Sequence, residues 1–267
     1  MKRAAIILAG GAGTRLRPLS SDANPKQFLR LFDGRSLIEL TFARVARLLD
    51  ADAIFVSTNE QYRDLVHQHL PTMPETNILA EPARRNTAPA IALSCFTIEE
   101  RLGDCAIAVL PSDHFISDED EFVRVLDRAF TFAEQSSMLV MIGIEPAEPN
   151  TGYGYLELSD EIEPGVIRLR RVVEKPDAAR AEEFLRAGNY AWNAGMFIWR
   201  SDAFRRELAT HAPEIMLVTR ETYESMPSIS IDYALMEKSS NIAAVRGNFG
   251  WSDVGSFEAL AKVGAKF

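Results

Sequence analysis

The sequence predicts an α/β protein with a Rossmann-like, mainly parallel central sheet, helices on both faces and a smaller mixed half that binds substrate. In the first half of the chain, short and almost continuously apolar segments alternate with amphipathic stretches. This alternation is typical of parallel strands that are buried on both faces and connected by helices. After Pro149 the pattern changes, and neighbouring apolar segments look like antiparallel strands. Ligands bind such sheets beyond the carboxyl ends of the strands, so functional residues are expected in the segments that follow strands.

In the first half, short apolar runs predict the strands and amphipathic periodicity predicts the helices. The strands are Ala4–Ala9, Ile54–Ser57, Asn77–Ala80, Ala106–Leu110 and Met138–Ile144. The helices are Ser36–Leu49, Gln61–Leu70, Thr87–Arg101 and Glu119–Ala133. Ser36 and Glu39 form a capping box that opens the first helix, and Pro89 is tolerated in the first turn of the third.

The second half is predicted to mix antiparallel strands with helices. The strands are Tyr153–Leu158, Val166–Val173 and Trp192–Trp199. The helices are Asp177–Ala187, Asp202–Thr210 and Ile231–Lys238. No low-complexity linker, repeat or charge block separates the two halves, so residues 1–267 are expected to form a single domain with halves 1–148 and 149–267.

Composition and charge argue against several classes of protein. Lys and Arg number 29 and Asp and Glu number 38, so the net charge is 29 − 38 = −9. Nucleic-acid binding requires a basic surface and is therefore not expected. The apolar run Ala4–Ala9 is shorter than the roughly 7–15 residues of a secretory h-region, and no other run approaches transmembrane length. We expect a cytoplasmic protein with no membrane partner, in which Cys95 and Cys105 are buried thiols.

A glycine-rich segment follows the first predicted strand. Residues Leu8–Leu16 read LAGGAGTRL, and glycines let the backbone approach a bulky anion and direct N–H groups at it. The segment is neither a dinucleotide fingerprint nor a P-loop, because Leu16 and Arg15 stand where those motifs need glycine. Glycines alone would equally suit a turn between strand and helix. Thr14, Arg15 and the nearby Lys26 favour phosphate binding, because Arg and Lys suit polyphosphate oxygens.

Two aspartates are candidates for a magnesium site. Asp113 follows the strand Ala106–Leu110 in the segment PSDH, and Asp253 lies in the segment WSDVG. Mg²⁺ is commonly held by one or two carboxylates together with phosphates. Asp113 has the alternative role of capping a turn, and His114 is expected to be a hydrogen-bonding neighbour because Mg²⁺ prefers oxygen ligands. The sequence leaves open whether Asp113 and Asp253 meet.

Charged and amide side chains at two strand ends in the second half suit a sugar phosphate. Glu174 and Lys175 follow the strand Val166–Val173, and Asn193 lies at the start of the strand Trp192–Trp199. Carboxylate and amide groups hydrogen-bond sugar hydroxyls, and a cation pairs with the phosphate. Glu-Lys-Pro taken alone is more often a surface turn, so the three residues predict a sugar-phosphate site only in combination.

Together these segments resemble the sugar-1-phosphate nucleotidyltransferases, and most closely the bacterial mannose-1-phosphate guanylyltransferases. The similarity covers essentially the whole chain and runs in order through Gly10–Leu19, Pro25–Leu29, Glu81–Ile91, Leu110–Phe115, Gly152–Glu157, Glu174–Asp177, Trp192–Phe197, Ser230–Lys238 and Trp251–Gly255. The segments PKQF and EPARRNTAPAI look like the mannose and GTP branch of that family rather than the thymidylyl or uridylyl branches.

The resemblance implies transfer of GMP from GTP to mannose 1-phosphate, giving GDP-mannose and pyrophosphate by metal-assisted in-line attack. It implies a nucleotide-binding half, 1–148, with contacts from Leu8, Gly10, Gly11, Ala12, Gly13, Thr14, Arg15, Lys26, Glu81, Asn86 and Thr87. It implies a sugar-binding half, 149–267, with contacts from Gly154, Glu174, Lys175 and Asn193. Asp113 and Asp253 would hold Mg²⁺ or another divalent cation, and catalytic roles are implied for Arg15, Lys26 and Lys175.

The sequence departs from the family at its carboxyl end. Family members commonly continue into a left-handed β-helix, and long members add an isomerase domain, whereas this sequence ends at Phe267 and is expected to contain neither. Assembly therefore stays open, with a homodimer as one candidate. The rival functions are the same reaction with another hexose or nucleotide, and a non-catalytic sensor of nucleotide sugars. Arg15, Lys26, Asp113, Lys175 and Asp253 argue against a sensor, which has little need of pyrophosphate and metal groups.

Overall fold

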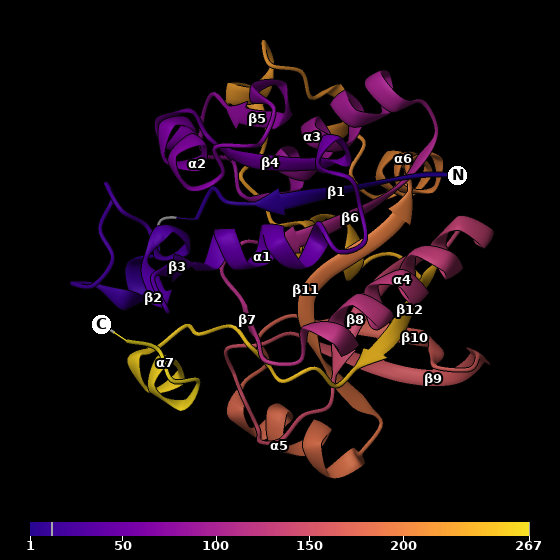
Figure 1. The fold of residues 1–267 in the computed structure, drawn as a ribbon. Helices are drawn as coiled ribbons and strands as arrows, with labels where there is room; N and C mark the ends of the chain where they lie inside the picture. Colours follow the sequence, from indigo (N-terminus) through magenta and orange to yellow (C-terminus); the bar gives the residue numbers. More distant parts are fainter. Residues whose placement is uncertain (12, 267) are drawn as a thin grey trace.

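A nine-stranded mixed sheet forms the centre of the computed structural model, which describes residues 1–11 and 13–266. Its strands are β1 (Lys2–Leu8), β4 (Ile54–Asn59), β5 (Ile78–Glu81), β6 (Cys105–Pro111), β8 (Leu139–Ile144), β9 (Tyr155–Glu163), β10 (Val166–Val173), β11 (Tyr190–Arg200) and β12 (Ile242–Gly247). They are arranged in the order β5-β4-β1-β6-β11-β8-β12-β10-β9, from one end of the molecule in Figure 1 to the other.

The sheet has a parallel part and an antiparallel part. β5, β4, β1 and β6 are parallel neighbours, and β8 and β12 are also parallel. β11 runs antiparallel between β6 and β8, while β9 and β10 form an antiparallel pair next to β12. β11 comes from the second half of the chain and lies between β6 and β8 of the first half, and its start also pairs with β9. The sheet is therefore continuous across the boundary at residue 148.

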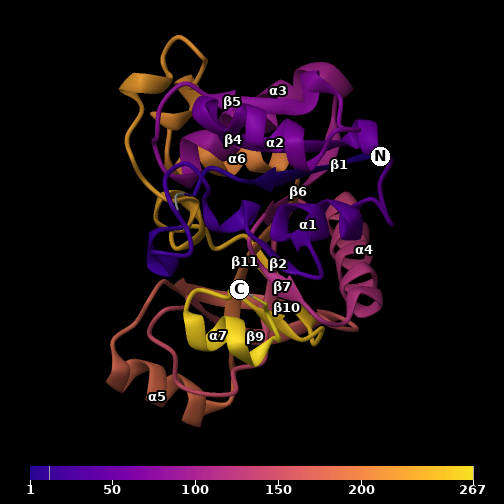
Figure 2. The same cartoon turned by 60° about the vertical axis from the view of Figure 1, so that its left-hand side comes forward.

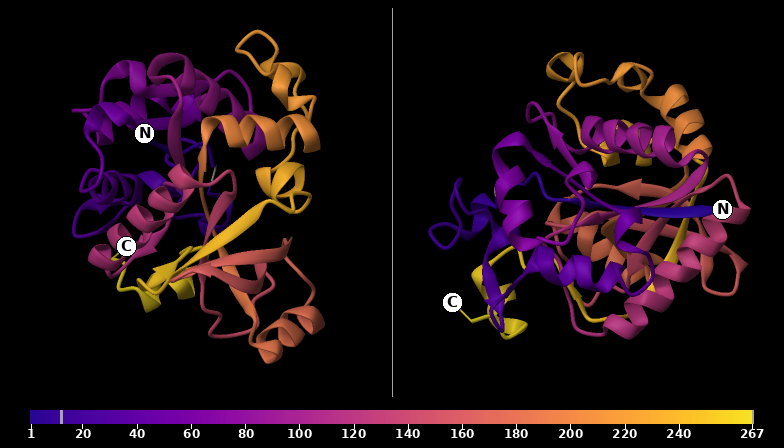
Figure 3. Two further views of the ribbon diagram at one scale, coloured as in Figure 1. Left: turned by 90° about the vertical axis from the view of Figure 1, so that its right-hand side faces the viewer. Right: turned by 45° about the horizontal axis from the view of Figure 1, so that its top comes forward.

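Helices cover both faces of this sheet. The long ones are α1 (Leu37–Val45), α2 (Arg63–His69), α3 (Thr87–Leu102), α4 (Glu119–Gln135), α5 (Ala178–Ala187) and α6 (Ser201–His211). In β1, Ala5 and Ile7 join one apolar core with residues of α1, α2 and α4, whereas Ala4 and Ile6 join another with residues of α3 and α6. This follows from the alternation of side chains along a strand. Figure 2 shows α3 above β1 and α1 below it, and Figure 3 shows the orange α6 on the side of α3.

The structure confirms the predicted α/β fold class and several local features. The capping box of Ser36 and Glu39 is formed at the start of α1, and Cys95 and Cys105 are buried free thiols. The first predicted helix ends at Val45 rather than Leu49, because the chain continues in tighter turns such as Leu48 N–H to Val45 C=O. Among the described residues, no helix has the length and apolar character needed to cross a bilayer.

Other elements differ from the prediction or were not predicted. The helix predicted at Ile231–Lys238 is a π-helical turn, η8 (Asp232–Met236). β12, the short pairs β2 (Arg30–Phe32) with β3 (Arg35–Ser36) and β7 (Phe115–Ile116) with β13 (Trp251–Ser252), and α7 (Phe257–Lys262) were not predicted. The four strands of the short pairs have only two or three residues each and carry no periodicity, and β7 and β13 also depend on a partner that is distant along the chain. Short 3₁₀ turns lie at Thr14–Leu16, Lys26–Phe28, Ala51–Ala53, Glu60–Tyr62, Glu75–Asn77, Ile215–Leu217 and Tyr223–Ser225.

The short pair β7 and β13 brings the end of the chain to the carboxyl end of β6. Trp251 pairs with Ile116, and Ser252 pairs with Phe115. The two segments that carry Asp113 and Asp253 therefore lie side by side. Beyond α7, the backbone N–H of Lys266 donates to the carbonyl of Leu31 at 2.9 Å, which places the carboxyl end beside β2 and β3 (Figure 1).

Candidate functional site

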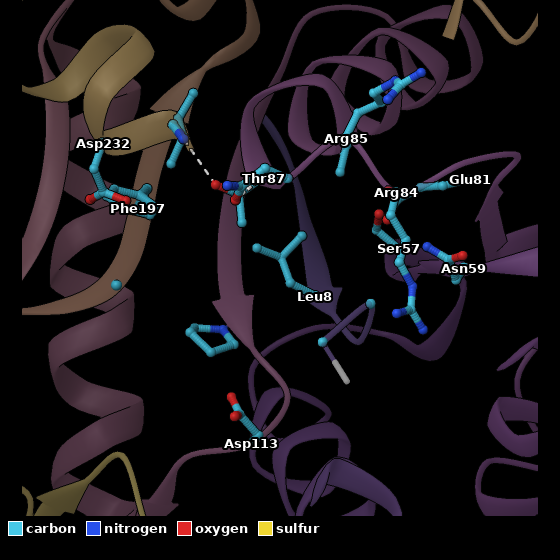
Figure 4. A pocket seen from close by; sticks show the side chains of 17 residues that line it. Leu8, Ser57, Asn59, Glu81, Arg84, Arg85, Thr87, Asp113, Phe197 and Asp232 are labelled. Atoms are coloured by element: carbon cyan, nitrogen blue, oxygen red, sulfur yellow. Dashed lines mark hydrogen bonds between the residues drawn. The ribbon is translucent and has the colours of Figure 1, made fainter. Parts of the chain in front are cut away.

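The first cavity of the site opens at the carboxyl ends of the parallel strands and has a volume of about 410 Å³. Its walls come from the ends of β1, β4, β5 and β6, the first turn of α3, the middle of β11 and the start of η8. Figure 4 shows Glu81, Ser57 and Asn59 on one side, Asp232 and Phe197 on the other, and Asp113 at one end. The lining residues are Leu8, Gly10, Gly11, Ser57, Asn59, Glu81, Arg84, Arg85, Asn86, Thr87, Ala90, Pro111, Asp113, Gly195, Phe197, Ile231 and Asp232.

The glycine segment contributes backbone to this cavity. A Cβ at Gly10 would lie 3.2 Å from Oε1 of Glu81. Gln27 fixes the segment, because its Nε2 donates to the carbonyls of Ala9 at 2.9 Å and Gly11 at 3.0 Å. Gly13 has φ 61°, and a Cβ there would lie 2.7 Å from the backbone nitrogen of Lys26. These close approaches explain the glycines at positions 10 and 13.

The remaining residues of the predicted phosphate loop lie elsewhere. Thr14 and Arg15 belong to a 3₁₀ turn, and the Arg15 side chain is 68% exposed and does not line the first cavity. Lys26 is buried and Gly13 packs on it, and neither lines that cavity. Ala12 lies outside the described residues. Leu8, Gly10 and Gly11 are therefore the parts of the predicted segment that face the cavity.

Glu81 places a buried carboxyl group in the wall of the first cavity. Its side chain is 6% exposed, and Oε2 accepts a hydrogen bond of 2.6 Å from the hydroxyl of Tyr223. Burial raises the pKa of Glu81 to about 7, although the hydrogen bond from Tyr223 opposes this shift. Near neutral pH this group can therefore either accept or donate a hydrogen bond to a ligand.

The start of α3 also faces the first cavity. Asn86 has φ 63° and caps the helix, because its Oδ1 accepts from the backbone N–H of Thr87 at 2.9 Å. The Thr87 hydroxyl accepts from the backbone N–H of Ile231 at 2.9 Å, the contact drawn as a dashed line in Figure 4. The first N–H groups of α3 are already used, because Thr87 donates to Asn86, Ala88 donates to the carbonyl of Ile229 at 3.1 Å, and Pro89 has none. The positive end of the helix dipole is what favours an anionic ligand here.

Asp113 and Asp253 meet at the ammonium group of Lys26. Nζ of Lys26 pairs with Oδ2 of Asp113 at 2.8 Å and also donates to the backbone carbonyl of Asp253. The Asp253 carboxylate accepts from the hydroxyl of Tyr153 at 2.9 Å and lies 3.6 Å from the Arg15 guanidinium. Burial opposes ionisation of Asp113, but the charge of Lys26 outweighs it and lowers the pKa of that carboxyl group. Lys26 thus favours the ionised form of Asp113, and both aspartate side chains offer oxygen ligands.

This pair fits a hard divalent cation, which prefers carboxylate oxygens and completes its shell with water and phosphate. Across residues 1–11 and 13–266, no group of three or more His, Cys, Asp or Glu side chains is arranged to hold a metal. A cation at Asp113 and Asp253 would therefore take its other ligands from substrate or water. His114 is a hydrogen-bonding neighbour, as predicted, because its Nδ1 accepts from Nε1 of Trp251 at 3.1 Å. Burial lowers the pKa of His114 to about 4, so it is neutral.

A second, smaller cavity of about 160 Å³ adjoins the first. Its lining residues are Pro111, His114, Gly152, Tyr153, Gly154, Glu174, Lys175, Asn193, Ala194, Gly195, Asp232, Trp251 and Asp253. Pro111, Gly195 and Asp232 also line the first cavity, so the two are neighbours. All four residues predicted for the sugar phosphate line this second cavity.

These four residues are packed against one another. Lys175 forms an ion pair with Glu174. A Cβ at Gly154 would lie 2.5 Å from Oε2 of Glu174 and 3.2 Å from Cβ of Asn193, so a larger residue there would displace the Glu174 carboxylate. The carbonyl of Gly154 accepts from the backbone N–H of Asn193 at 2.8 Å. The amide of Asn193 is held in turn by Asp232, which accepts from Nδ2 at 2.9 Å.

Several residues of the two cavities were not identified from the sequence. Asp232 and Gln27 lie inside segments that carried the family resemblance, but no role was assigned to them. Tyr153 also lies inside such a segment, whereas Tyr223 does not, and each tyrosine hydrogen-bonds a carboxylate that is distant along the chain. Burial and the neighbouring Glu174 carboxylate raise the pKa of Asp232 to about 6, which marks it as part of the site.

Comparison with known proteins supplies close matches over the whole chain. A model of the nucleotidyl transferase family matches residues 4–267. The chain is 40% identical to the xanthan biosynthesis protein XanB of Xanthomonas campestris, over 97% of this chain and 58% of that protein. It is 39% identical to a mannose-1-phosphate guanylyltransferase of Sinorhizobium fredii, over 96% of this chain and 54% of that protein. The chain thus spans somewhat more than half the length of these relatives.

A solved structure is similar over the full chain. The crystal structure described as a mannose-1-phosphate geranyltransferase from Thermus thermophilus superposes with a TM-score of 0.92 and 33% sequence identity. The superposition covers 100% of this chain and 80% of that one.

Proposed function

The chain belongs to the nucleotidyl transferase family, and from this premise we propose that it transfers GMP from GTP to mannose 1-phosphate. A phosphate oxygen of mannose 1-phosphate attacks the α-phosphorus of GTP, and a new oxygen–phosphorus bond forms. The bond from the α-phosphorus to the β-bridging oxygen breaks, so that GDP-mannose and pyrophosphate are the products. The observation that supports this most directly is the pair of adjoining cavities, which differ in size and chemistry and share Pro111, Gly195 and Asp232 as lining residues.

The nucleotide is proposed to occupy the larger cavity. Guanine carries two adjacent donors, N1–H and the 2-amino group, and the carboxylate of Glu81 offers two acceptor oxygens. Adenine lacks this pair of donors, so Glu81 accounts for a preference for GTP over ATP. The backbone at Gly10 and Gly11 is suited to the anionic part of the nucleotide, and the positive end of the α3 dipole at Thr87 adds favourable potential.

The sugar phosphate is proposed to occupy the smaller cavity. Glu174 and Asn193 supply acceptors and donors for the hexose hydroxyls, and Lys175 supplies the cation for its phosphate. Gly154 leaves the space in which Glu174 lies. The polar groups of this site are held in a fixed arrangement by one another. A sugar that leaves one of their remaining donors or acceptors without a hydrogen bond should therefore bind much more weakly.

Charge neutralisation between the two cavities is assigned to three side chains and a divalent cation. Lys26 lies at Asp113 and Asp253, Arg15 lies at the exposed side of Asp253, and Lys175 lies in the sugar cavity. Arg15 is proposed to bind the departing pyrophosphate. Asp113 and Asp253 would hold Mg²⁺, which when bound stabilises negative charge on phosphate oxygens. Chemistry of this kind depends on positioning and electrostatics and needs no covalent intermediate.

Release of pyrophosphate tests the proposal. The purified protein is mixed with Mg²⁺, GTP and mannose 1-phosphate, and pyrophosphate is measured with a coupled assay. Parallel reactions replace GTP by ATP or UTP, and mannose 1-phosphate by glucose 1-phosphate. Fastest release with GTP and mannose 1-phosphate supports the assignment. Faster release with another pair selects the rival substrates, and binding of GDP-mannose by folded protein without release from any pair selects the sensor.

The cellular setting follows from the substrates. GTP and hexose phosphates are charged and are made inside cells, so we propose a cytoplasmic location. A homodimer is the proposed assembly, and light scattering of the purified protein measures its mass directly.

A further inference from the structure

The π-helical turn η8 and the residue that follows it, Glu237, contact both residues that are proposed to bind the hexose. A π-turn carries one more residue than an α-turn, and such turns occur frequently at functional sites. η8 begins at Asp232, which lines both cavities, and is followed directly by Glu237. Figure 4 shows Asp232 on the wall opposite Glu81.

The amino end of η8 fixes the amide of Asn193. Oδ1 of Asp232 accepts from Nδ2 of Asn193 at 2.9 Å, and Oδ1 of Asn193 accepts from the backbone N–H of Gly195 at 2.9 Å. These two bonds settle which side of the amide is donor and which is acceptor. One N–H and one lone pair of Asn193 stay available for a ligand.

The carboxyl end of η8 fixes the backbone of Glu174. Oε1 of Glu237 accepts from the backbone N–H of Glu174 at 2.8 Å. The next residue, Lys175, has φ 45°, a left-handed conformation that is unfavourable for a residue with a side chain. A strained backbone of this kind persists only when its surroundings hold it, and the contact from Glu237 does so.

η8 is itself held rigidly, so these contacts are well defined. Ala234, Leu235 and Met236 are buried in the core that contains α3 and α6. The segment before the turn is joined to the start of α3, because Ile231 N–H donates to the Thr87 hydroxyl at 2.9 Å and Ala88 N–H donates to the Ile229 carbonyl at 3.1 Å. The same short segment therefore contacts the nucleotide cavity and both ends of the sugar cavity.

We propose that η8 with Glu237 is the positioning element of the sugar site, in which Asp232 and Glu237 hold Asn193 and Glu174 in the arrangement that reads the hexose hydroxyls. Asp232 and Glu237 are positioning residues, because each acts through a residue that contacts the sugar. The proposal rests on the proposed function, since it concerns the selection of the sugar phosphate by that enzyme.

The test compares removal of each carboxylate with its amide replacement. Asp232→Ala and Glu237→Ala remove the acceptor, whereas Asp232→Asn and Glu237→Gln keep an oxygen that accepts the same hydrogen bond. Asp202→Ala is the matched control, because Asp202 also accepts charged hydrogen bonds, from Arg200 and Arg206, but lines neither cavity. Each variant is measured for KM with mannose 1-phosphate, KM with GTP, and the ratio of kcat/KM between mannose 1-phosphate and glucose 1-phosphate.

Asp232→Ala leaves the Nδ2 donor of Asn193 without its partner. Because an unpaired buried donor is costly, KM for mannose 1-phosphate is expected to rise about tenfold, while KM for GTP stays within about twofold. Glu237→Ala is expected to give a smaller rise of about threefold, because its hydrogen bond is exposed. Both alanine variants should lower the ratio of kcat/KM for mannose 1-phosphate to that for glucose 1-phosphate. Asp232→Asn and Glu237→Gln should restore the wild-type values to within about twofold, since the hydrogen bonds are retained.

The outcomes separate this inference from the proposed function. Wild-type protein that releases no pyrophosphate from GTP and mannose 1-phosphate overturns the proposed function, and this inference with it, before any variant is made. Active wild type combined with an Asp232→Ala variant that changes both KM values equally, or neither, overturns the positioning role alone. If the melting temperature shows that Asp232→Ala does not fold, Glu237→Ala and Glu237→Gln provide the test instead. Equal KM values for mannose 1-phosphate in these two variants would overturn the proposal.

Discussion

The two cavities of the site are built in different ways. The larger one lies at the ends of parallel strands, beside Gly10 and Gly11 and at the start of α3, with Glu81 as its buried carboxyl group. The smaller one is shaped by side chains that bind one another, in the pairs Glu174 with Lys175 and Asn193 with Asp232.

This difference predicts different responses to substitution. A cavity at the ends of paired parallel strands should keep its overall shape when one side chain is lost, because the strand pairing remains in place. A network of paired side chains loses the geometry of one member when its partner is removed, since the partner is left unpaired. The acidic pair between the cavities serves both substrates, so its loss should affect both equally.

The largest effect is expected for the acidic pair. Asp113→Asn and Asp253→Asn should each lower kcat by about 10²–10³, the usual cost of losing preorganised charge stabilisation. Chelation of divalent cations in the wild-type protein should lower kcat similarly, and added Mg²⁺ should restore it. The measurement is pyrophosphate release, with Asp202→Asn as the control carboxylate. Full turnover in chelator by folded protein would show that no metal is needed.

The next largest effect is expected in the side-chain network. Glu174→Ala and Asn193→Ala should lower kcat/KM for mannose 1-phosphate by roughly 10- to 100-fold, because paired hydroxyls and buried groups lose their partners. The ratio of kcat/KM for mannose 1-phosphate to that for glucose 1-phosphate should fall, and the preference for GTP over ATP should persist. Values of kcat/KM for both sugars and both nucleotides are required. Loss of nucleotide preference with intact sugar preference would reverse the assignment of the two cavities.

A pH-dependent effect is expected in the larger cavity. The pKa of Glu81 is raised to about 7 by burial, so the group is mostly protonated below that pH and mostly ionised above it. The ionised form accepts the guanine donors, and the ratio of kcat/KM for GTP to that for ATP should therefore rise up to about tenfold between pH 6 and 8.

Two variants test the origin of this pH profile. Glu81→Gln cannot ionise and should give a flat ratio over the same range. Tyr223→Phe removes the hydrogen bond that opposes the shift, so the rise should move to higher pH. The ratio to ATP corrects for ionisation of the triphosphate itself. A rise that survives in Glu81→Gln would assign the profile to another group.

The smallest effects are expected from substitution of one glycine in each cavity. In Gly154→Ala the new Cβ would lie 2.5 Å from Glu174 Oε2, and overpacking of this kind should raise KM for mannose 1-phosphate at least about fivefold. In Gly11→Ala the new Cβ meets nothing within 4 Å, so KM for GTP should change by less than about threefold. Michaelis constants of both variants for both substrates give the comparison. A larger effect of Gly11→Ala on the sugar phosphate would contradict it.

The sequence by itself determined the features that depend on neighbours along the chain. The capping box of Ser36 and Glu39 is formed by residues within one turn, and its pattern is visible in four letters. The buried strands of the first half follow from continuous apolar runs. Leu8, Gly10 and Gly11 face the larger cavity because they follow the first strand, and chain order alone places them at its carboxyl end.

Only the tertiary structure decided which distant segments meet. Asp113 and Asp253 come together because β7 pairs with β13, and each of those strands has two residues and no recognisable pattern. Asp232 hydrogen-bonds Asn193, and Tyr223 hydrogen-bonds Glu81. Both contacts depend on the segment around Ile229, which packs on the start of α3 although the two are distant along the chain. Local periodicity reports the face that a residue buries but not the partner it meets there, because that partner is chosen by the packing of the whole sheet and its helices.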